Sequence, residues 1–312
     1  MQDILTCAMG LDIHRDVIVA CLAKGELGTD PEIEIRSFST LIPEMRKLRD
    51  WVLEAECRYV AMESTGIYWQ PIYEMLEPCF DGQINILVVN ARHMKNVPGR
   101  KTDMRDAQWI ATLLRAGLLK GSFIPDKTFR ELRHLTRYRK SIVRDITAQK
   151  NRIDKFLQSS GFRFTAFLSD AFGASGRNII RHLMEYGNIS REALDRCLKT
   201  QTRKRIVEIL IALNGSLSEH QRGFLRMIFG HLEALEQHRH TVEDAITKEI
   251  TKHEEALSLL CSIPGIDVTA AAAIIAEIGT DMSAFPDSQH ICSWAGLSPG
   301  NNESAGKRKS AH

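Results

Sequence analysis

The pattern of apolar residues changes once along this chain, at about residue 126, and no other sequence feature constrains the fold as strongly. Before that point, short β-branched runs alternate with segments of helical spacing, and after it the spacing is helical almost throughout. We therefore predict an α/β domain over residues 1–125, a helical region over 126–259 and a small helical C-terminal domain over 260–312.

The first region is predicted to contain a mixed sheet. Three β-branched runs separated by polar turns form an antiparallel meander, with expected ranges of 5–13, 17–23 and 32–38. Helices and strands then alternate, with expected ranges of 43–56, 59–62, 68–76, 85–89 and about 102–116. A meander followed by such crossovers is typical of a mixed sheet covered by helices.

The helical region is predicted to contain two long helices. Each has an apolar seam near the a and d positions of a heptad. The seam residues are Leu132, Leu135, Ile142, Ile146, Ile153 and Phe156 in the first helix, and Leu225, Ile228, Leu232, Leu235, Val242, Ile246 and Ile250 in the second. A seam does not identify its partner, so an intramolecular bundle and an intermolecular coiled coil both remain open.

The cysteines and the absence of an apolar span predict a cytoplasmic protein. The chain has seven cysteines, an odd number, and no Cys-x-x-Cys pair, which argues against a disulfide framework or a zinc site. Free thiols are typical of a reducing compartment. No basic leader precedes an apolar run at the N-terminus, and no apolar run is long enough to span a bilayer.

The net charge of +2 hides a strongly basic segment. Residues 127–155 contain ten Lys and Arg against three acids, a local charge of +7, whereas residues 233–255 contain seven acids against three bases. A run of one sign favours contact with nucleic-acid phosphates over an ordinary solvated face. The residues predicted to make that contact are Arg130, Arg133, Arg137, Arg139, Lys140 and Arg144.

Four acids lie at the ends of elements that a mixed sheet would bring together. Asp12 lies near the end of the first strand, and Glu63 follows the strand over 59–62. Asp103 and Asp106 share one face at the start of the helix expected over about 102–116. Enzymes of the two-metal type hold two magnesium ions with such carboxylates. Taken singly, each acid has an ordinary explanation as a helix cap, a turn residue or a local ion pair.

Residues 8–118 resemble the N-terminal domain of the DEDD transposases of bacterial insertion sequences, the Piv/MooV-like group. The similarity lies in AMGLDIHRD, in VAMESTGIYW and above all in the Lys101-Thr-Asp103-x-x-Asp106-Ala run. The resemblance implies a RuvC-like, RNase H-like fold with Asp12, Glu63, Asp103 and Asp106 as a tetrad for two magnesium ions. Arg100, Lys101 and Arg105, beside this site, are expected to hold phosphates of the scissile strand.

The C-terminal region is similar to the second domain of the same family. The similarity lies in a Gly-Leu-Ser-Pro motif at 296–299, followed by Ser304-Ala-Gly-Lys307. It implies that Ser304 is the nucleophile that forms a phosphoserine ester with DNA. A serine hydroxyl needs activation, which we expect the metal site and nearby Lys307 or Arg308 to supply. Apart from the family, Ser304 is simply a turn residue. Members usually continue through a further helix, so this domain is expected to be shortened.

A second feature of this region is Ile263-Pro-Gly-Ile266 before an Ala-rich helix, which resembles a helix-hairpin-helix. A turn of that kind exposes backbone N–H groups to a DNA phosphate. An ordinary helix start explains the same residues, so both interpretations stay open.

Together these features predict a transposase or site-specific DNA recombinase. The resemblance also implies a structured guide RNA as partner and a homodimer or homotetramer. A hydrolytic RuvC-like nuclease with water as nucleophile, and a non-catalytic nucleic-acid-binding or dimerisation protein, are the alternatives. An actin-like ATPase also opens with a Gly-Leu-Asp strand, but the sequence lacks a Gly-rich nucleotide motif.

Overall fold

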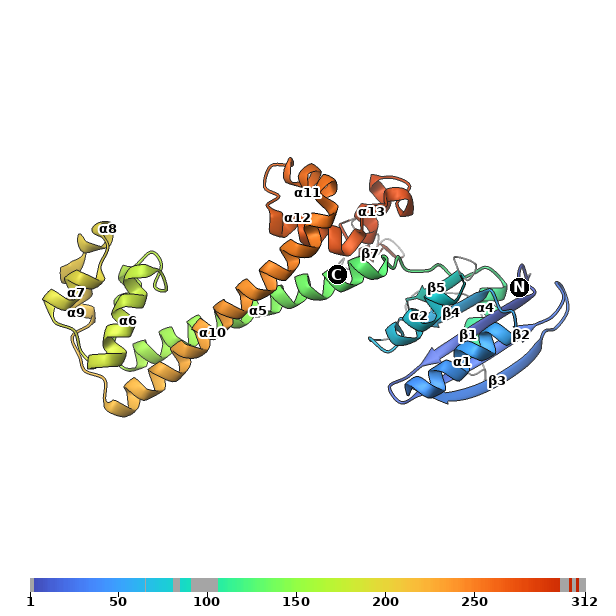
Figure 1. The fold of residues 1–312 in the computed structure, drawn as a ribbon, viewed down its shortest axis with the longest axis horizontal. Coiled ribbons are helices and arrows are strands. Elements are labelled where there is room, and N and C mark those ends of the chain that lie inside the picture. Colours follow the sequence, from blue (N-terminus) through green and yellow to red (C-terminus); the bar gives the residue numbers. More distant parts are fainter. Residues whose placement is uncertain are drawn as a thin grey trace. The chain divides into compact units, whose positions relative to one another are not determined.

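The computed structural model divides into two compact units, Met1–Ile124 and Pro125–His312 (Figure 1). It describes residues 3–64, 66–80, 85–90 and 106–297, together with the backbone of two short C-terminal strands. Among these residues, no helix is both long and apolar enough to cross a bilayer.

The first unit is built on a five-stranded mixed sheet with the strand order β3-β2-β1-β4-β5. The strands are β1 (Cys7–Ile13), β2 (Val17–Lys24), β3 (Glu32–Ser39), β4 (Tyr59–Glu63) and β5 (Asn85–Val89). β1, β2 and β3 pair antiparallel, which confirms the predicted meander, while β4 is parallel to both β1 and β5. The arrangement is compatible with an RNase H-like fold.

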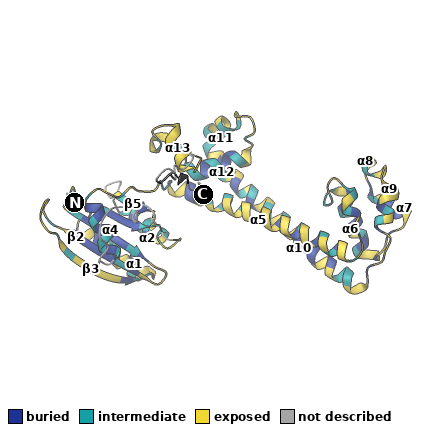
Figure 2. Cartoon of the chain, turned by 180° about the vertical axis from the view of Figure 1, so that it is seen from behind, coloured by how far each residue is buried: buried dark blue, intermediate teal, exposed yellow. Residues whose placement is uncertain are grey.

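Helices cover both faces of this sheet. Alternate residues of each strand point to opposite sides, and apolar residues on both sides form a core with the helices there. Met9 and Leu11 of β1 pack in one core with α1 (Ile42–Glu54) and α2 (Gln70–Leu76), which continues into the 3₁₀ turn η1 (Glu77–Phe80). Ala8 packs on the other side, against α4 (Asp106–Arg115). Figure 2 shows the resulting burial in the middle of the sheet.

The second unit is organised around two long helices, α5 (Lys127–Ser159) and α10 (Glu219–Ile250), which pack side by side (Figure 1). They run antiparallel: Gln149 Nε2 donates to the Ile228 carbonyl oxygen at 2.6 Å, and Arg139 pairs with Glu243 further along. Most of the predicted seam residues are buried in the core of this unit, and Leu135, Phe156 and Leu235 are partly buried. Within one chain, the two seams therefore pack on each other.

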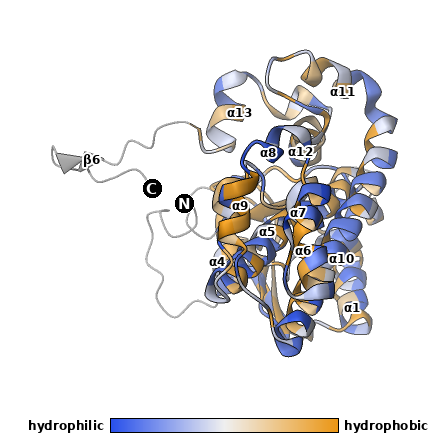
Figure 3. Cartoon of the chain, turned by 90° about the vertical axis from the view of Figure 1, so that its left-hand side faces the viewer, coloured by the Kyte–Doolittle hydropathy of each residue, from blue (hydrophilic) through white to orange (hydrophobic). Residues whose placement is uncertain are grey.

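Shorter helices fill the chain between and after these two. They are η2 (Phe164–Phe167), α6 (Ala174–Tyr186), α7 (Arg191–Cys197), α8 (Thr200–Arg203), α9 (Ile206–Ala212), η3 (Thr251–His253), α11 (Glu254–Cys261), α12 (Val268–Ile278), η4 (Met282–Ala284) and α13 (Ser288–Trp294). Figure 3 shows α9 as a largely apolar helix. Within it, Ile209 is buried, whereas Val207 and Ile211 are exposed.

The first C-terminal helices pack on the long pair. Ala272 and Ile275 of α12 belong to the same core as α5 and α10, and the phenyl ring of Phe129 lies against Gly279. Residues beyond 259 thus share a compact unit with the helical region, while the predicted boundary at residue 260 stays a prediction. α11 and α12 are joined by a turn in which Gly265 adopts a φ of 91°, a conformation that favours glycine.

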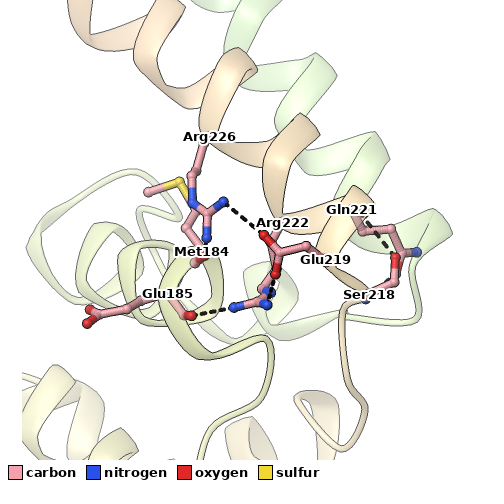
Figure 4. A network of polar contacts seen from close by, with 7 residues as sticks. All are labelled: Met184, Glu185, Ser218, Glu219, Gln221, Arg222 and Arg226. Atoms are coloured by element: carbon pink, nitrogen blue, oxygen red, sulfur yellow. Dashed lines mark hydrogen bonds and ion pairs between the residues drawn. The ribbon is translucent and has the colours of Figure 1, made fainter.

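The start of α10 is fixed by a capping box and two arginines (Figure 4). Gln221 N donates to Ser218 Oγ at 3.2 Å, and Ser218 N donates to Gln221 Oε1 at 2.8 Å. Arg222 and Arg226 donate to carbonyl oxygens in the last turn of α6, at 2.5 and 2.7 Å. These contacts join the N-terminal turns of α10 to the end of α6.

We expect Ser218→Ala to lower the free energy of unfolding of the second unit by about 1 kcal/mol, because the Gln221 backbone N–H loses its acceptor, Ser218 Oγ. Thermal unfolding followed by circular dichroism measures this loss as a decrease in Tm of about 2–4 °C. Ser216→Ala is the matched control, because Ser216 is exposed two residues earlier. Equal Tm values for the two variants would contradict a stabilising cap.

Candidate active site

Asp12 and Glu63 lie at the carboxyl ends of neighbouring parallel strands. Leu11 of β1 is in register with Met62 of β4, so the two acids are the next residues along each strand. Leu11 and Met62 point into the core that contains α1 and α2. Neighbouring residues of a strand point to opposite faces of a sheet, so Asp12 and Glu63 lie on the other face, which packs on α4. The register therefore brings these two predicted ligands to one edge of the sheet.

α4 brings Asp106 to the same edge. Asp106 is the first residue of this helix, and Gly10 of β1 lies directly under its first turns. A Cβ atom at Gly10 would lie 2.2 Å from the Ala107 carbonyl oxygen and 2.4 Å from the Ala111 amide nitrogen. Only a residue without a side chain allows this approach, so Gly10 positions Asp106 near Asp12.

The other end of α4 is fixed by Arg115, a buried arginine. Its Nε donates to the Leu5 carbonyl oxygen at 3.0 Å, and its guanidinium pairs with Asp3 at 3.3 Å. The backbone of Ile4 in turn donates to the Arg115 carbonyl oxygen at 2.8 Å. The helix is therefore held antiparallel to β1, with its N-terminus at the carboxylate end of the strand.

The electrostatics of Asp12 indicate that the three acids share one environment. Burial raises the pKa of Asp12, and the negative charges of Asp106 and Glu63 raise it further. His14 opposes these effects, because its Nε2 lies 3.1 Å from Asp12 Oδ2. Three carboxylates that repel one another in this way are a site that a cation would stabilise.

The donor set fits magnesium, which prefers carboxylate oxygens. In the part of the chain that the structure describes, no three His, Cys, Asp or Glu side chains already form a group that could hold one ion. The fourth predicted ligand, Asp103, lies outside the described residues, as do Arg100, Lys101 and Arg105. The complete tetrad and the phosphate contacts beside it therefore remain predictions.

Ser304 and Lys307 are described only by their backbone. They pair directly with each other in a small antiparallel sheet formed by β6 (Glu303–Ser304) and β7 (Lys307–Arg308). The predicted nucleophile and its predicted basic neighbour thus occupy opposite positions of one short hairpin.

Several arginines of the basic segment make contacts inside the second unit. Arg137 forms a bidentate pair with Glu277 of α12, at 2.8 and 2.9 Å. Arg133 donates to the carbonyl oxygen of the same glutamate at 2.8 Å, and Arg139 pairs with Glu243 at 2.7 Å. Arg130 is buried and donates to the Pro125 carbonyl oxygen at 2.9 Å. Arg133, Arg137 and Arg139 thus hold α5 against α12 and α10, while Arg130 fixes the chain that leads into α5.

Lys140 and Arg144 differ from these arginines. Both are exposed, one helical turn apart on α5, and neither has a hydrogen bond or ion pair with any residue that the structure describes. Their positive charges are thus available to an anion in solution. Of the six residues on α5 predicted to contact nucleic acid, these two are the ones without a partner among the described residues, and the contact itself stays a prediction.

Sequence reasoning missed His14 as a partner of Asp12. The signal was present, because residues two apart in an extended segment point to the same side. His14 closes the hairpin between β1 and β2 through its backbone, which donates to the Val17 carbonyl oxygen at 2.9 Å. The turn thereby holds the imidazole beside the carboxylate.

Two family models match the two ends of the chain. Residues 9–161 match a DEDD transposase model of the IS110 family, described as "Transposase", and residues 257–312 match one described as "Transposase IS116/IS110/IS902 family". These are IS110-family transposase domains. The first match includes all four predicted tetrad positions, and the second includes Ser304. No curated protein matches the chain.

The IS110-family domains support an insertion-sequence transposase, an enzyme that moves DNA, with DNA as its partner. This agrees with the resemblance found in the sequence.

Proposed function

We propose that this chain is a magnesium-dependent, RNA-guided recombinase that cuts and rejoins DNA through a phosphoserine ester. The observation that supports it best is the convergence of Asp12, Glu63 and Asp106 at one edge of the sheet, within a matched transposase domain. Asp103, three residues before Asp106, completes the set that would hold magnesium. The bound metal would supply Lewis-acid stabilisation of the charge that develops on the scissile phosphate.

Each residue of the chain has a defined part in this proposal. Asp12, Glu63, Asp103 and Asp106 hold the cation site, and His14 orients the Asp12 carboxylate. The Ser304 hydroxyl loses its proton and forms an ester with the scissile phosphorus, while the bond from phosphorus to one deoxyribose oxygen breaks and leaves a free hydroxyl end. Attack of a deoxyribose hydroxyl on this ester rejoins DNA and releases the serine.

A denaturing gel tests the covalent step. We expect magnesium-dependent cleavage of insertion-sequence ends to give a protein-linked DNA strand that protease treatment releases. Ser304→Ala should remove the linked product, while Ser298→Ala, in the same region, should keep it. Cleavage that survives Ser304→Ala without any linked product would contradict the phosphoserine and favour a hydrolytic nuclease.

DNA is proposed to follow the exposed basic side of α5. We expect the double variant Lys140→Ala, Arg144→Ala to weaken DNA binding in proportion to lost phosphate contacts, and to reduce the slope of log K against log salt by about 2. Fluorescence anisotropy at several salt concentrations measures both quantities. Lys204→Ala, which removes an exposed lysine near α8, is the control. An unchanged salt slope in the double variant would contradict this path.

Guidance by RNA is the part of the proposal that rests on family resemblance. Nucleic acid that copurifies with the protein, once sequenced, tests it. A discrete structured RNA from beside the protein's own gene would support a guide, and random fragments would count against it. The mass of the complex, from light scattering, distinguishes the proposed dimer or tetramer from a single copy.

A further inference from the structure

A pair of cysteines lies at the opposite end of β1 and β4 from the carboxylates. Cys7 begins β1, and Cys57 precedes Tyr59, the first residue of β4. The strands are parallel neighbours with Met9 in register with Val60, so both cysteines lie at the amino ends of the strands. Neither contributes to the proposed DNA chemistry.

The two thiols share one core. Cys57 belongs to the core that the sheet forms with α1 and α2, and Cys7 packs against the same core from the neighbouring strand. Cys57 is fully buried, whereas Cys7 is partly exposed. A small solute can therefore reach Cys7 first, and Cys57 only through it.

The surroundings make the two sulfur atoms chemically different. The hydrogen bond from Cys57 lowers the pKa of Cys7 to about 7, with help from the positive charges of Lys24 and Arg115, although burial opposes this. The same pairing, together with burial, raises the pKa of Cys57. Lys24 is directly opposite Cys7 in the β1–β2 ladder. At neutral pH Cys7 is thus partly a thiolate beside a thiol that stays protonated.

We propose that Cys7 and Cys57 form a peroxide-sensitive dithiol, in which Cys7 is the attacking sulfur and Cys57 the resolving one. The Cys7 thiolate attacks one oxygen of a hydroperoxide, the O–O bond breaks, and water or an alcohol leaves, giving a sulfenic acid. The Cys57 sulfur then attacks the Cys7 sulfur, and the S–O bond breaks as water leaves. Two thiols are oxidised to one disulfide for each peroxide reduced.

The disulfide would join β1 to the segment that enters β4, the two strands that supply Asp12 and Glu63. It would do so without touching the carboxylates, since these lie at the far ends of the same strands. Failure of this inference would leave the proposed DNA chemistry unaffected.

Treatment of the reduced full chain with one equivalent of hydrogen peroxide tests the pair. The chain is then unfolded in denaturant, the remaining thiols are blocked with N-ethylmaleimide, and peptides are identified by mass spectrometry. We expect a Cys7–Cys57 cross-linked peptide, with Cys21 and Cys292 recovered as alkylated thiols. Cys21 is a buried control in the same sheet, since burial raises its pKa to about 11, and Cys292 is an exposed one. Oxidation of Cys292 before Cys7 would overturn the proposal.

Two variants separate the roles of the sulfur atoms. In Cys57→Ser, peroxide should convert Cys7 to a sulfenic acid that persists and can be trapped by a 1,3-diketone. In Cys7→Ser, Cys57 should not react with peroxide. A further measurement uses the unmodified chain, so it does not depend on how these variants fold. At neutral pH, iodoacetamide should alkylate Cys7 about tenfold faster than Cys292, because part of Cys7 is thiolate. Equal or slower alkylation of Cys7 would contradict its assignment as the attacking thiolate.

Discussion

Replacement of Asp12 by Asn is expected to reduce the rate of DNA strand cleavage about a thousandfold, because a neutral amide cannot replace the charge that holds a cation at the scissile phosphate. The amide has the size of the carboxylate, so the fold of β1 should persist. The initial rate of cleavage of insertion-sequence ends, measured on denaturing gels at saturating magnesium, gives this ratio directly.

The same substitution should not destabilise the metal-free protein. The pKa of Asp12 is raised in the folded state, so its stabilising contribution is present at low pH and is lost as pH rises through that pKa. At neutral pH the ionised Asp12 therefore costs folding free energy, and Asn removes that cost. Asp16→Asn is the control, since Asp16 lies in the following turn with 88% of its side chain exposed. Cleavage by Asp12→Asn at the wild-type rate would contradict the site.

Gly10→Ala is expected to have the second largest effect. The new methyl group would lie 2.2 Å from the Ala107 carbonyl oxygen, a backbone atom, so α4 must move away from β1. Overpacking of this kind costs about 1–3 kcal/mol of unfolding free energy, and it displaces Asp106 from Asp12. We expect both a lower Tm of the first unit and a large loss of cleavage at temperatures where the variant is folded.

Gly121→Ala is the matched control for this prediction. Its added Cβ would lie 3.4 Å from Leu87 Cγ, an ordinary contact, so neither Tm nor cleavage should decrease appreciably. A Gly10→Ala variant with wild-type cleavage would show that close packing of α4 on β1 is not what positions Asp106.

The sequence was most informative about the sheet. The three β-branched runs separated by polar turns predict an antiparallel meander, and the structure confirms that β1, β2 and β3 pair in this way. The parallel crossovers likewise predict that Asp12 and Glu63 meet at one edge. The expected end of α1 was less accurate: it ends at Glu54, two residues early, before Glu56 adopts a φ of 52°.

The rest depends on contacts between distant segments. A run of positive charge cannot show which arginines are paired within the unit, because their acceptors lie more than a hundred residues away, at Glu243 and Glu277. Gly10 likewise has no local signal for the helix that packs on it almost a hundred residues later. These features follow from tertiary packing, so only the structure could separate Arg133 and Arg137, which pair with Glu277, from Lys140 and Arg144.

Magnesium binding to the full chain, measured by isothermal titration calorimetry without DNA, tests most directly whether the carboxylates from β1, β4 and α4 form one cation site. We predict that the wild-type chain and Asp16→Asn bind equally. Asp12→Asn, Glu63→Gln and Asp106→Asn should each weaken binding at least about tenfold, because each removes one charged ligand. Equal affinity in all five proteins, or no binding by the wild type, would contradict a shared metal site at this edge of the sheet.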